Sequence, residues 1–192
     1  SARTIAREAE SWRDGTPGGF VRSPGSDDNL FLKTDYNLGS SNFLMIRLSH
    51  DSRRTSDLNV GGIVTPEAGF GLVERDRQLA SSLTTVVSPD VLNEARVLLG
   101  TSRFEQDANS SDPGVTRPSG EFGGSNLNHQ LRKEDRLQLV DNLTWKLGPQ
   151  TLKFGIDVTH SSTDIAVRFN PHGNFLYNTD RPFEPGDCND LI

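Results

Sequence analysis

The sequence has no long hydrophobic run. Its longest uninterrupted apolar stretch covers residues 43–46, whereas a helix that spans a bilayer needs about twenty such residues. This shortage excludes a helical membrane protein. Only 33% of the residues are hydrophobic, which allows a rather polar globular domain or a β-barrel, whose alternating strands leave a much weaker hydropathy signal.

Cysteine is almost absent as well. The single Cys188 cannot form an internal disulfide, so no disulfide framework can be inferred. We expect this thiol to be an exposed bystander. The chain begins at Ser1 without a signal peptide and ends at Ile192 without a closing element, and we expect it to be an internal piece of a longer protein.

Patterns that carry chemistry are also missing. Lys and Arg are scattered in a chain of net charge -6, and the lack of a basic stripe argues against nucleic acid as a partner. The histidines His50, His129, His160 and His172 lack the short spacing of a metal site. There is no G-x-S-x-G elbow and no EF-hand pattern. We therefore expect no enzyme, no cofactor and no metal.

What the sequence does contain is alternation, most clearly in residues 131–161. A Gly-Pro turn signal at 147–150 separates two arms of about ten residues, the length of a tilted strand that spans a bilayer. Trp145 lies near this turn, where aromatic girdles mark the membrane interface. The apolar phase of the two arms holds Leu137, Leu139, Leu143, Trp145, Leu152, Phe154, Ile156 and Val158.

The same period-two pattern predicts two earlier hairpins. Strands are expected from residue 29 to 37 and from 44 to 51, with a tight turn at 38–41. A third strand is expected at 77–87, followed by a turn at 88–90.

Residues 91–104 are ambiguous. Ser88 as N-cap, Pro89 at the first position and Gly100 as a stop are typical of a helix. The alternative places Ala95, Val97 and Leu99 on one face of a strand and continues the rhythm of hairpins. We predict a strand.

The remaining segments predict loops. Residues 1–28 are expected to be loop with a short helix at the start, residues 52–75 and 105–130 are long polar connections, and residues 169–192 are loop around a weak strand at 173–178. The connections therefore alternate between tight and long, as in outer-membrane barrels. The sequence predicts one all-β unit, an antiparallel up-and-down meander of six strands in three hairpins over residues 29–168, forming part of a transmembrane barrel with long extracellular loops.

Three segments carry a resemblance to a known family. Residues 29–51, 85–104 and 135–158 resemble, in order and spacing, the barrel of TonB-dependent outer-membrane receptors, especially the Oar-like branch with a carboxypeptidase-regulatory-like domain. The likeness includes a K-x-D-Y strand at Lys33, an N-E-x-R strand at Asn93 and a W-x-x-G hairpin at Trp145. It covers about two thirds of the chain and also implies that residues 91–104 form a strand.

The resemblance implies an outer-membrane location in a Gram-negative bacterium, contact with lipid, and import of an unidentified substrate. Energy would come from TonB through a plug domain that this chain does not contain. The hairpin departs from the family at Gly148-Pro149-Gln150, where G-K-H is usual. A different class of protein stays open at this point, namely a soluble or surface β-sandwich that binds a ligand or partner through its long loops.

The polar phase of the strands supplies the candidate binding residues. In a barrel they would form the lumen wall, and contact with a ligand is the less common role for any one of them. They are Lys33, Asp35, Arg47, Glu94, Arg96, Lys153 and Asp157.

Overall fold

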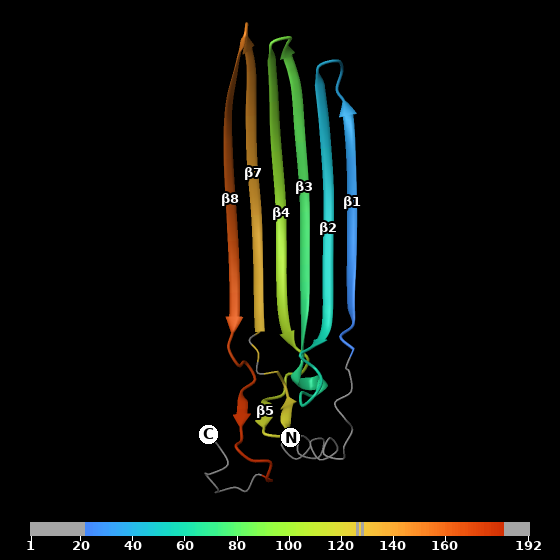
Figure 1. The fold of residues 1–192 in the computed structure, drawn as a ribbon, viewed down its shortest axis with the longest axis vertical. Coiled ribbons are helices and arrows are strands. Elements are labelled where there is room, and N and C mark those ends of the chain that lie inside the picture. Colours follow the sequence, from blue (N-terminus) through green and yellow to red (C-terminus); the bar gives the residue numbers. More distant parts are fainter. Residues whose placement is uncertain (1–21, 126, 128, 183–192) are drawn as a thin grey trace.

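Six long strands form one open antiparallel sheet, in the order β1-β2-β3-β4-β7-β8 (Figure 1). The computed structural model describes residues 22–125, 127 and 129–182. The predicted all-β meander is confirmed. The strand bounds are β1 Gly25–Asn37, β2 Asn42–Leu58, β3 Phe70–Ser88, β4 Val91–Ala108, β7 His129–Leu147 and β8 Gln150–Arg168.

The three tight turns lie at one end of the sheet and the long connections at the other, as predicted (Figure 1). The turn between β7 and β8 consists of Gly148 and Pro149, and Gly148 has a φ of 55°. A positive φ at the first central position suits the type II′ hairpin turn, whose twist matches that of the strands. The Gly-Pro signal in the sequence therefore has a direct conformational cause.

The ambiguous segment is strand β4, as predicted. The features typical of a helix start serve a β-turn instead, because the backbone amide of Asp90 donates to Ser88 Oγ at 3.3 Å. Val91 to Ala108 then pairs with β3 on one side and with β7 on the other. Two complete backbone ladders outweigh the local helix propensity of this segment.

The long strands extend further than the sequence predicted. β1 begins at Gly25 rather than residue 29, and the expected loop at 52–75 is mostly strand, since β2 ends at Leu58 and β3 begins at Phe70. Between them lies a short 3-10 helix, η1 (Pro66–Ala68). The prediction failed because the end of β2 is polar on both faces and the start of β3 carries apolar residues on both, so neither end alternates. The ladder between them also contains a bulge between Thr55 and Leu58.

The expected loop at 105–130 is also partly ordered. It contains β5 (Gly114–Arg117) and β6 (Gly120–Gly123), which form a second sheet in the order β6-β5-β9 with β9 (Asn174–Leu176). β9 confirms the weak strand predicted at 173–178, and it pairs with β5 in parallel. We call this small sheet, together with η1 and the connecting segments next to them, the cap.

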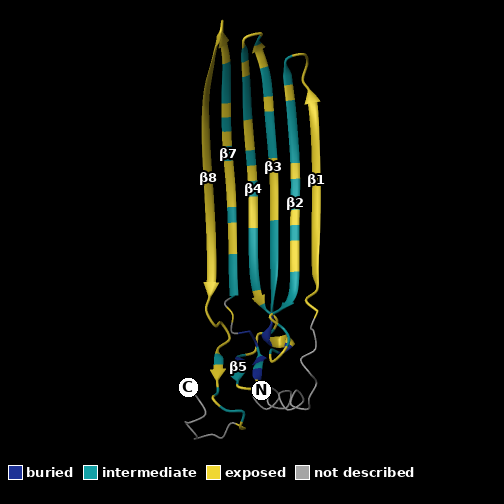
Figure 2. Cartoon of the chain, viewed as in Figure 1, coloured by how far each residue is buried: buried dark blue, intermediate teal, exposed yellow. Residues whose placement is uncertain are grey.

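The buried side chains of the described part lie in the cap rather than in the large sheet. Ala68, Phe122, Thr65 and Ser125 are the most enclosed of them, and Phe122 is 6% exposed. By contrast β1 and β8 are exposed along their whole length (Figure 2). The large sheet therefore has no hydrophobic core of its own.

No helix within the described ranges is long and apolar enough to cross a bilayer. The short helix expected near the N-terminus and Cys188 lie outside the described residues.

Candidate functional site

The register of the six strands places alternate residues on two chemically different faces. Leu32, Leu48, Leu79, Leu99 and Leu137 lie opposite one another across five successive strands. We call them the leucine row and the face that carries them the apolar face. The other face, which carries the residues between, is called the polar face.

The apolar face has a continuous band from the leucine row to Trp145, next to the tight turns. The apolar phase predicted for the hairpin of residues 131–161 is confirmed, because Leu139 pairs with Val158, Leu143 with Phe154 and Trp145 with Leu152. The whole band comprises Leu32, Tyr36, Leu44, Ile46, Leu48, Leu79, Leu83, Val91, Ala95, Val97, Leu99, Leu137, Leu139, Leu143, Trp145, Leu152, Phe154, Ile156 and Val158.

The size of this band fits a membrane. From Leu137 to Trp145 the strand is about 27 Å long at 3.4 Å per residue. At a tilt of 35–45° it rises about 19–22 Å, slightly less than the lipid-facing band of about 25 Å in barrels of this kind. Phe154 is 56% exposed and Ile156 is 62% exposed. Side chains of this size exposed to water would be costly, since burying each is worth about 1.5–3 kcal/mol.

Nothing in the described part of the chain covers the apolar face. The extensive contacts of the long strands are with their sheet neighbours, and the small sheet lies beyond the long-connection end. A β-sandwich needs a second sheet packed face to face on the first, so the described residues do not support the sandwich alternative.

One carboxylate interrupts the band. Asp141 lies between Leu139 and Leu143 in the same phase, opposite Ala95 and Ile156. Its Oδ1 accepts a hydrogen bond from Asn93 Nδ2 at 2.8 Å. This bond satisfies one of its oxygens within the sheet.

The seven candidate binding residues predicted from the sequence share the polar face. Lys33 and Asp35 form an ion pair at 3.0 Å, as do Arg96 and Glu94. Asp157 accepts from Gln138 Nε2 through both carboxylate oxygens at 3.0 Å. Arg47 and Lys153 also lie on this face but have no ionic partner among the described residues.

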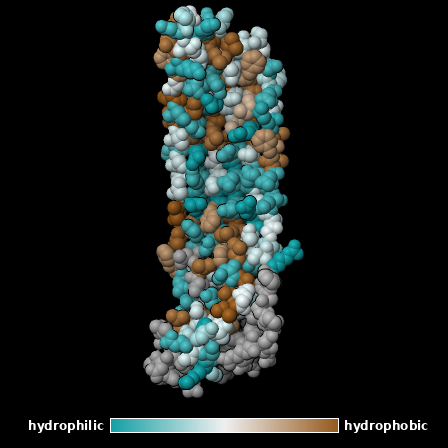
Figure 3. All heavy atoms as spheres, viewed as in Figure 1, coloured by the Kyte–Doolittle hydropathy of each residue, from teal (hydrophilic) through white to brown (hydrophobic). Residues whose placement is uncertain are grey.

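This polar wall is hydrophilic and shallow. A hollow of about 430 Å³ lies on it between β2 and β8, with Arg47, Arg96 and Asp157 in its lining. Figure 3 shows hydrophilic side chains mixed with hydrophobic patches over the visible side of the molecule. Ion pairs neutralise part of its charge, and water can solvate the charges that remain.

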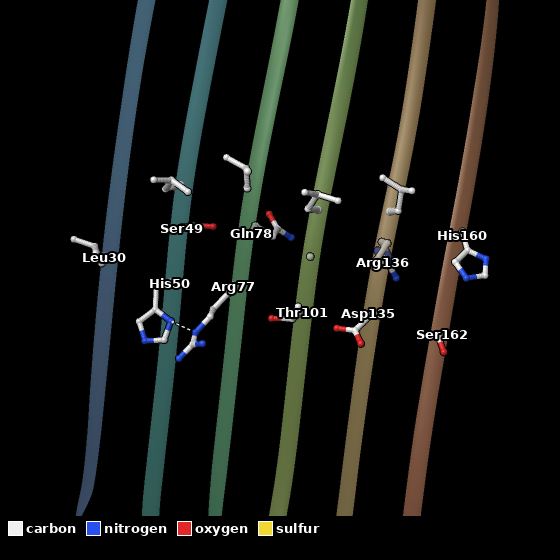
Figure 4. A pocket seen from close by; sticks show the side chains of 15 residues that line it. Leu30, Ser49, His50, Arg77, Gln78, Thr101, Asp135, Arg136, His160 and Ser162 are labelled. Carbon is white, nitrogen blue, oxygen red and sulfur yellow. Dashed lines mark hydrogen bonds between the residues drawn. The ribbon is translucent and has the colours of Figure 1, made fainter.

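A second hollow, of about 800 Å³, lies across the sheet at the edge of the leucine row (Figure 4). His50, Arg77, Asp135 and His160 border it on the side of the long connections. Arg77 Nε donates to His50 Nδ1 at 3.4 Å. Sequence reasoning missed this polar edge because its members come from strands far apart in the sequence.

The described residues contain no cluster of three or more His, Cys, Asp or Glu side chains that could hold a metal ion. His129 instead pairs with a single carboxylate, since its Nδ1 lies 3.0 Å from Asp107 Oδ1.

Comparison with known families agrees with this geometry. The family model described as "Outer membrane beta barrel domain" matches residues 13–187. The chain belongs to this family. Searches of curated proteins and of solved structures found no match.

Membership of the barrel family determines what each face meets. In outer-membrane barrels the outward residues form an apolar band and the alternate residues face a polar interior. The apolar face is therefore the lipid-facing surface, and Trp145 and Tyr36, near the tight turns, lie where an aromatic girdle is expected. The polar face borders the interior.

Proposed function

We propose that this chain forms part of the wall of a TonB-dependent receptor that imports a scarce nutrient across the outer membrane of a Gram-negative bacterium. The barrel family and the three segments that resemble such receptors support the proposal. The observation that carries it is the combination of an exposed apolar band on one face of the sheet with a polar, partly ion-paired wall on the other.

The openness of the sheet supports a barrel with more strands. Among the described residues, β1 and β8 each pair on one side only. Lipid cannot satisfy the unpaired N–H and C=O groups of their outer edges. Further strands must therefore pair with both edges in the membrane, which agrees with the large barrels of TonB-dependent receptors.

In this proposal the chain has no catalytic task. Its polar wall encloses the solute pathway, its apolar band anchors the barrel, and the energy of transport arrives from TonB through a plug domain. The nutrient is recognised elsewhere in the protein or by the cap and its neighbouring loops.

Uptake in cells tests the proposal. Cells with and without the full-length gene are compared for uptake of iron complexes, glycans and peptides under scarcity, each with and without TonB. We expect one nutrient class whose uptake needs both the gene and TonB. Uptake that depends on the gene but persists without TonB would show a passive barrel and overturn the proposal.

The orientation of the sheet is a separate prediction. Epitope tags at Gly62, which is exposed in the connection between β2 and β3, should be accessible to antibody on whole cells because long loops face outward in such barrels. A tag at Gly148-Pro149 should react only after the cells are opened. The reverse pattern would invert the proposed topology.

A further inference from the structure

A carboxylate lies in the middle of the lipid-facing band. Asp141 is exposed on β7 and shares the apolar phase of its strand, four residues from Leu137 and four from Trp145. Four residues cover about 13 Å along a strand, or about 10 Å of height at a tilt of 35–45°. Asp141 therefore stands near the centre of the hydrocarbon layer, where an ionisable side chain is rare and typically marks a functional site.

The sheet satisfies this carboxylate only in part. Asn93 Nδ2 donates to Asp141 Oδ1 at 2.8 Å, whereas no described residue donates to Oδ2 or forms an ion pair with it. A carboxylate has about four lone-pair sites that accept hydrogen bonds, and lipid chains offer no donor. Asp141 therefore keeps unused acceptor capacity in a medium that cannot supply donors.

Asn93 retains a matching donor. It lies on the same face of β4, directly opposite Leu143 and one row nearer the tight turns than Asp141. Its amide nitrogen carries two hydrogens, one of which is used by Asp141. The other makes only a long contact of 3.4 Å with Asn142 O. A spare donor and a spare acceptor thus lie on neighbouring strands, about 4.8 Å apart.

A second polar pair on the same face has no comparable excess. Thr85 Oγ1 donates to Asn42 Oδ1 at 2.8 Å, in the same row of the sheet as Asn93. These two side chains are neutral and lie one row from the girdle level of Trp145. The sheet therefore pairs neutral polar groups near the edge of the lipid band, but it leaves a charged group at the centre of the band with a single bond.

The remaining strands of the barrel are too far away to complete this bonding. Asp141 has β4 on one side and β8 on the other, with Ala95 and Ile156 directly opposite. A further strand paired with β8 would stand about 9.6 Å from β7, two strand spacings away, with Ile156 between. Ala95 is short, and small side chains let two membrane-embedded surfaces approach closely. The missing donor therefore has to come from another molecule.

The two side chains complement themselves under two-fold symmetry. Two copies in one membrane share their orientation, so a two-fold axis that relates them runs along the membrane normal. If this axis passes between β4 and β7, it places β7 of one copy opposite β4 of the other. Asp141 of each copy then faces Asn93 of the second copy. The two contacts are generated by the same rotation, as in an isologous dimer interface.

We propose that this face binds a second copy of the protein within the membrane, through reciprocal hydrogen bonds from Asn93 of each copy to Asp141 of the other. Bonds to a carboxylate are about twice as strong as neutral ones. A different partner with a membrane-embedded cation would satisfy Asp141, but it would leave the spare donor of Asn93 unused. The inference rests on barrel membership and is independent of the proposed import function.

Energy transfer between copies tests the proposal. The full-length protein is labelled with a donor or an acceptor dye on a peptide tag at Gly62, which is exposed in a long connection. Both populations are reconstituted together in phosphatidylcholine vesicles. We expect energy transfer that decreases when unlabelled protein competes and when lipid dilutes the protein. Transfer no greater than that of randomly placed barrels would overturn the proposal.

A complementary pair of variants locates the contact. Asn93→Asp places carboxylates opposite carboxylates and should weaken self-association at least tenfold. Asp141→Asn leaves only neutral bonds and should weaken it several-fold. A mixture of the two variants again has an amide opposite each carboxylate, so it should associate more tightly than either variant alone, within about threefold of the parent protein. A mixture no tighter than Asn93→Asp alone would refute the contact.

Two variants on the polar face control for charge. Asn142→Asp and Glu94→Gln add and remove one negative charge on the same two strands, where Glu94 and Asn142 lie directly opposite each other. Each variant should associate like the parent protein. A loss in Asn142→Asp as large as that in Asn93→Asp would reduce the effect to net charge and contradict the assignment. Restored association in the mixture above also shows that both of its members are folded.

Discussion

The two halves of the long sheet use the same backbone structure with different side-chain patterns. From the tight turns to the leucine row, most residues alternate between an apolar face, which Asp141 interrupts, and a polar face. From the leucine row to the long connections the ladder continues, but both faces are largely polar, and the enclosed side chains belong to the cap. Alternation therefore reports which solvent each face meets, while the backbone ladder alone sustains the strand.

The largest contrast expected between the halves is contact with lipid. Spin labels at positions 152, 154 and 156 in the full-length protein should report lipid, and labels at 151, 153 and 155 should not. Labels at 164 and 166 have the same phase as the first set but lie beyond the leucine row, so they should report water or headgroups. Power-saturation EPR with oxygen and a water-soluble quencher measures whether each label lies in lipid or in water. If neither the labels at 152, 154 and 156 nor those at 151, 153 and 155 contact lipid, the barrel loses its physical basis.

A charge in the middle of the band should have the largest effect on stability. Leu83 occupies the central row between the leucine row and Trp145. Leu83→Arg should lower the free energy of unfolding by about 2–4 kcal/mol, and Phe154→Arg, one row nearer the turns, by less. Urea unfolding of the full-length protein in lipid vesicles provides the measurement.

Ser82 provides the control for that experiment. It is adjacent to Leu83 but faces the polar side, opposite Met45 and Arg96. Ser82→Arg should cost at most about 1 kcal/mol through repulsion from Arg96 on the neighbouring strand, since water or polar groups can solvate the new charge. Equal costs for Leu83→Arg and Ser82→Arg would mean that the two faces meet the same medium.

A cavity in the cap should act only locally. Phe122 is the large buried side chain there, and Phe122→Ala should lower the local stability by about 3 kcal/mol or less, at the low end of buried aromatic truncations. Hydrogen exchange should then speed up in β5 and β6 and stay unchanged in the paired centre of β3 and β4. Faster exchange in the long strands as well would show that the cap and the sheet form one cooperative unit.

The smallest effects concern two glycines at opposite ends of the sheet. Gly148 has a positive φ in the tight turn, so Gly148→Ala should cost about 1–2 kcal/mol through backbone strain. Gly71 lies in extended β3, where an added Cβ would meet Thr55 O at an ordinary 3.5 Å. Gly71→Ala should stabilise by about 0.5 kcal/mol. Thermal unfolding of the two variants compares them, and equal shifts would argue against the assigned turn.

The sequence alone was sufficient where local chemistry and solvent agree. The phase of residues 131–161, the tight turns and the shared face of Lys33 through Asp157 follow from a period of two and from Gly-Pro geometry, which are properties of neighbouring residues. The helix signals before β4 were overruled correctly because the resemblance and the rhythm of hairpins pointed to a strand.

Tertiary structure decided what depends on residues far apart in the chain. The ends of β2 and β3 near the long connections have no apolar–polar alternation to detect. The parallel pairing of β5 with β9 joins residue 114 to residue 174. Arg75, Arg103 and Lys133 lie side by side only because the register of β3, β4 and β7 brings them together. Backbone hydrogen bonds between distant segments carry no signature in the side-chain pattern of either segment, which is why these features needed the folded sheet.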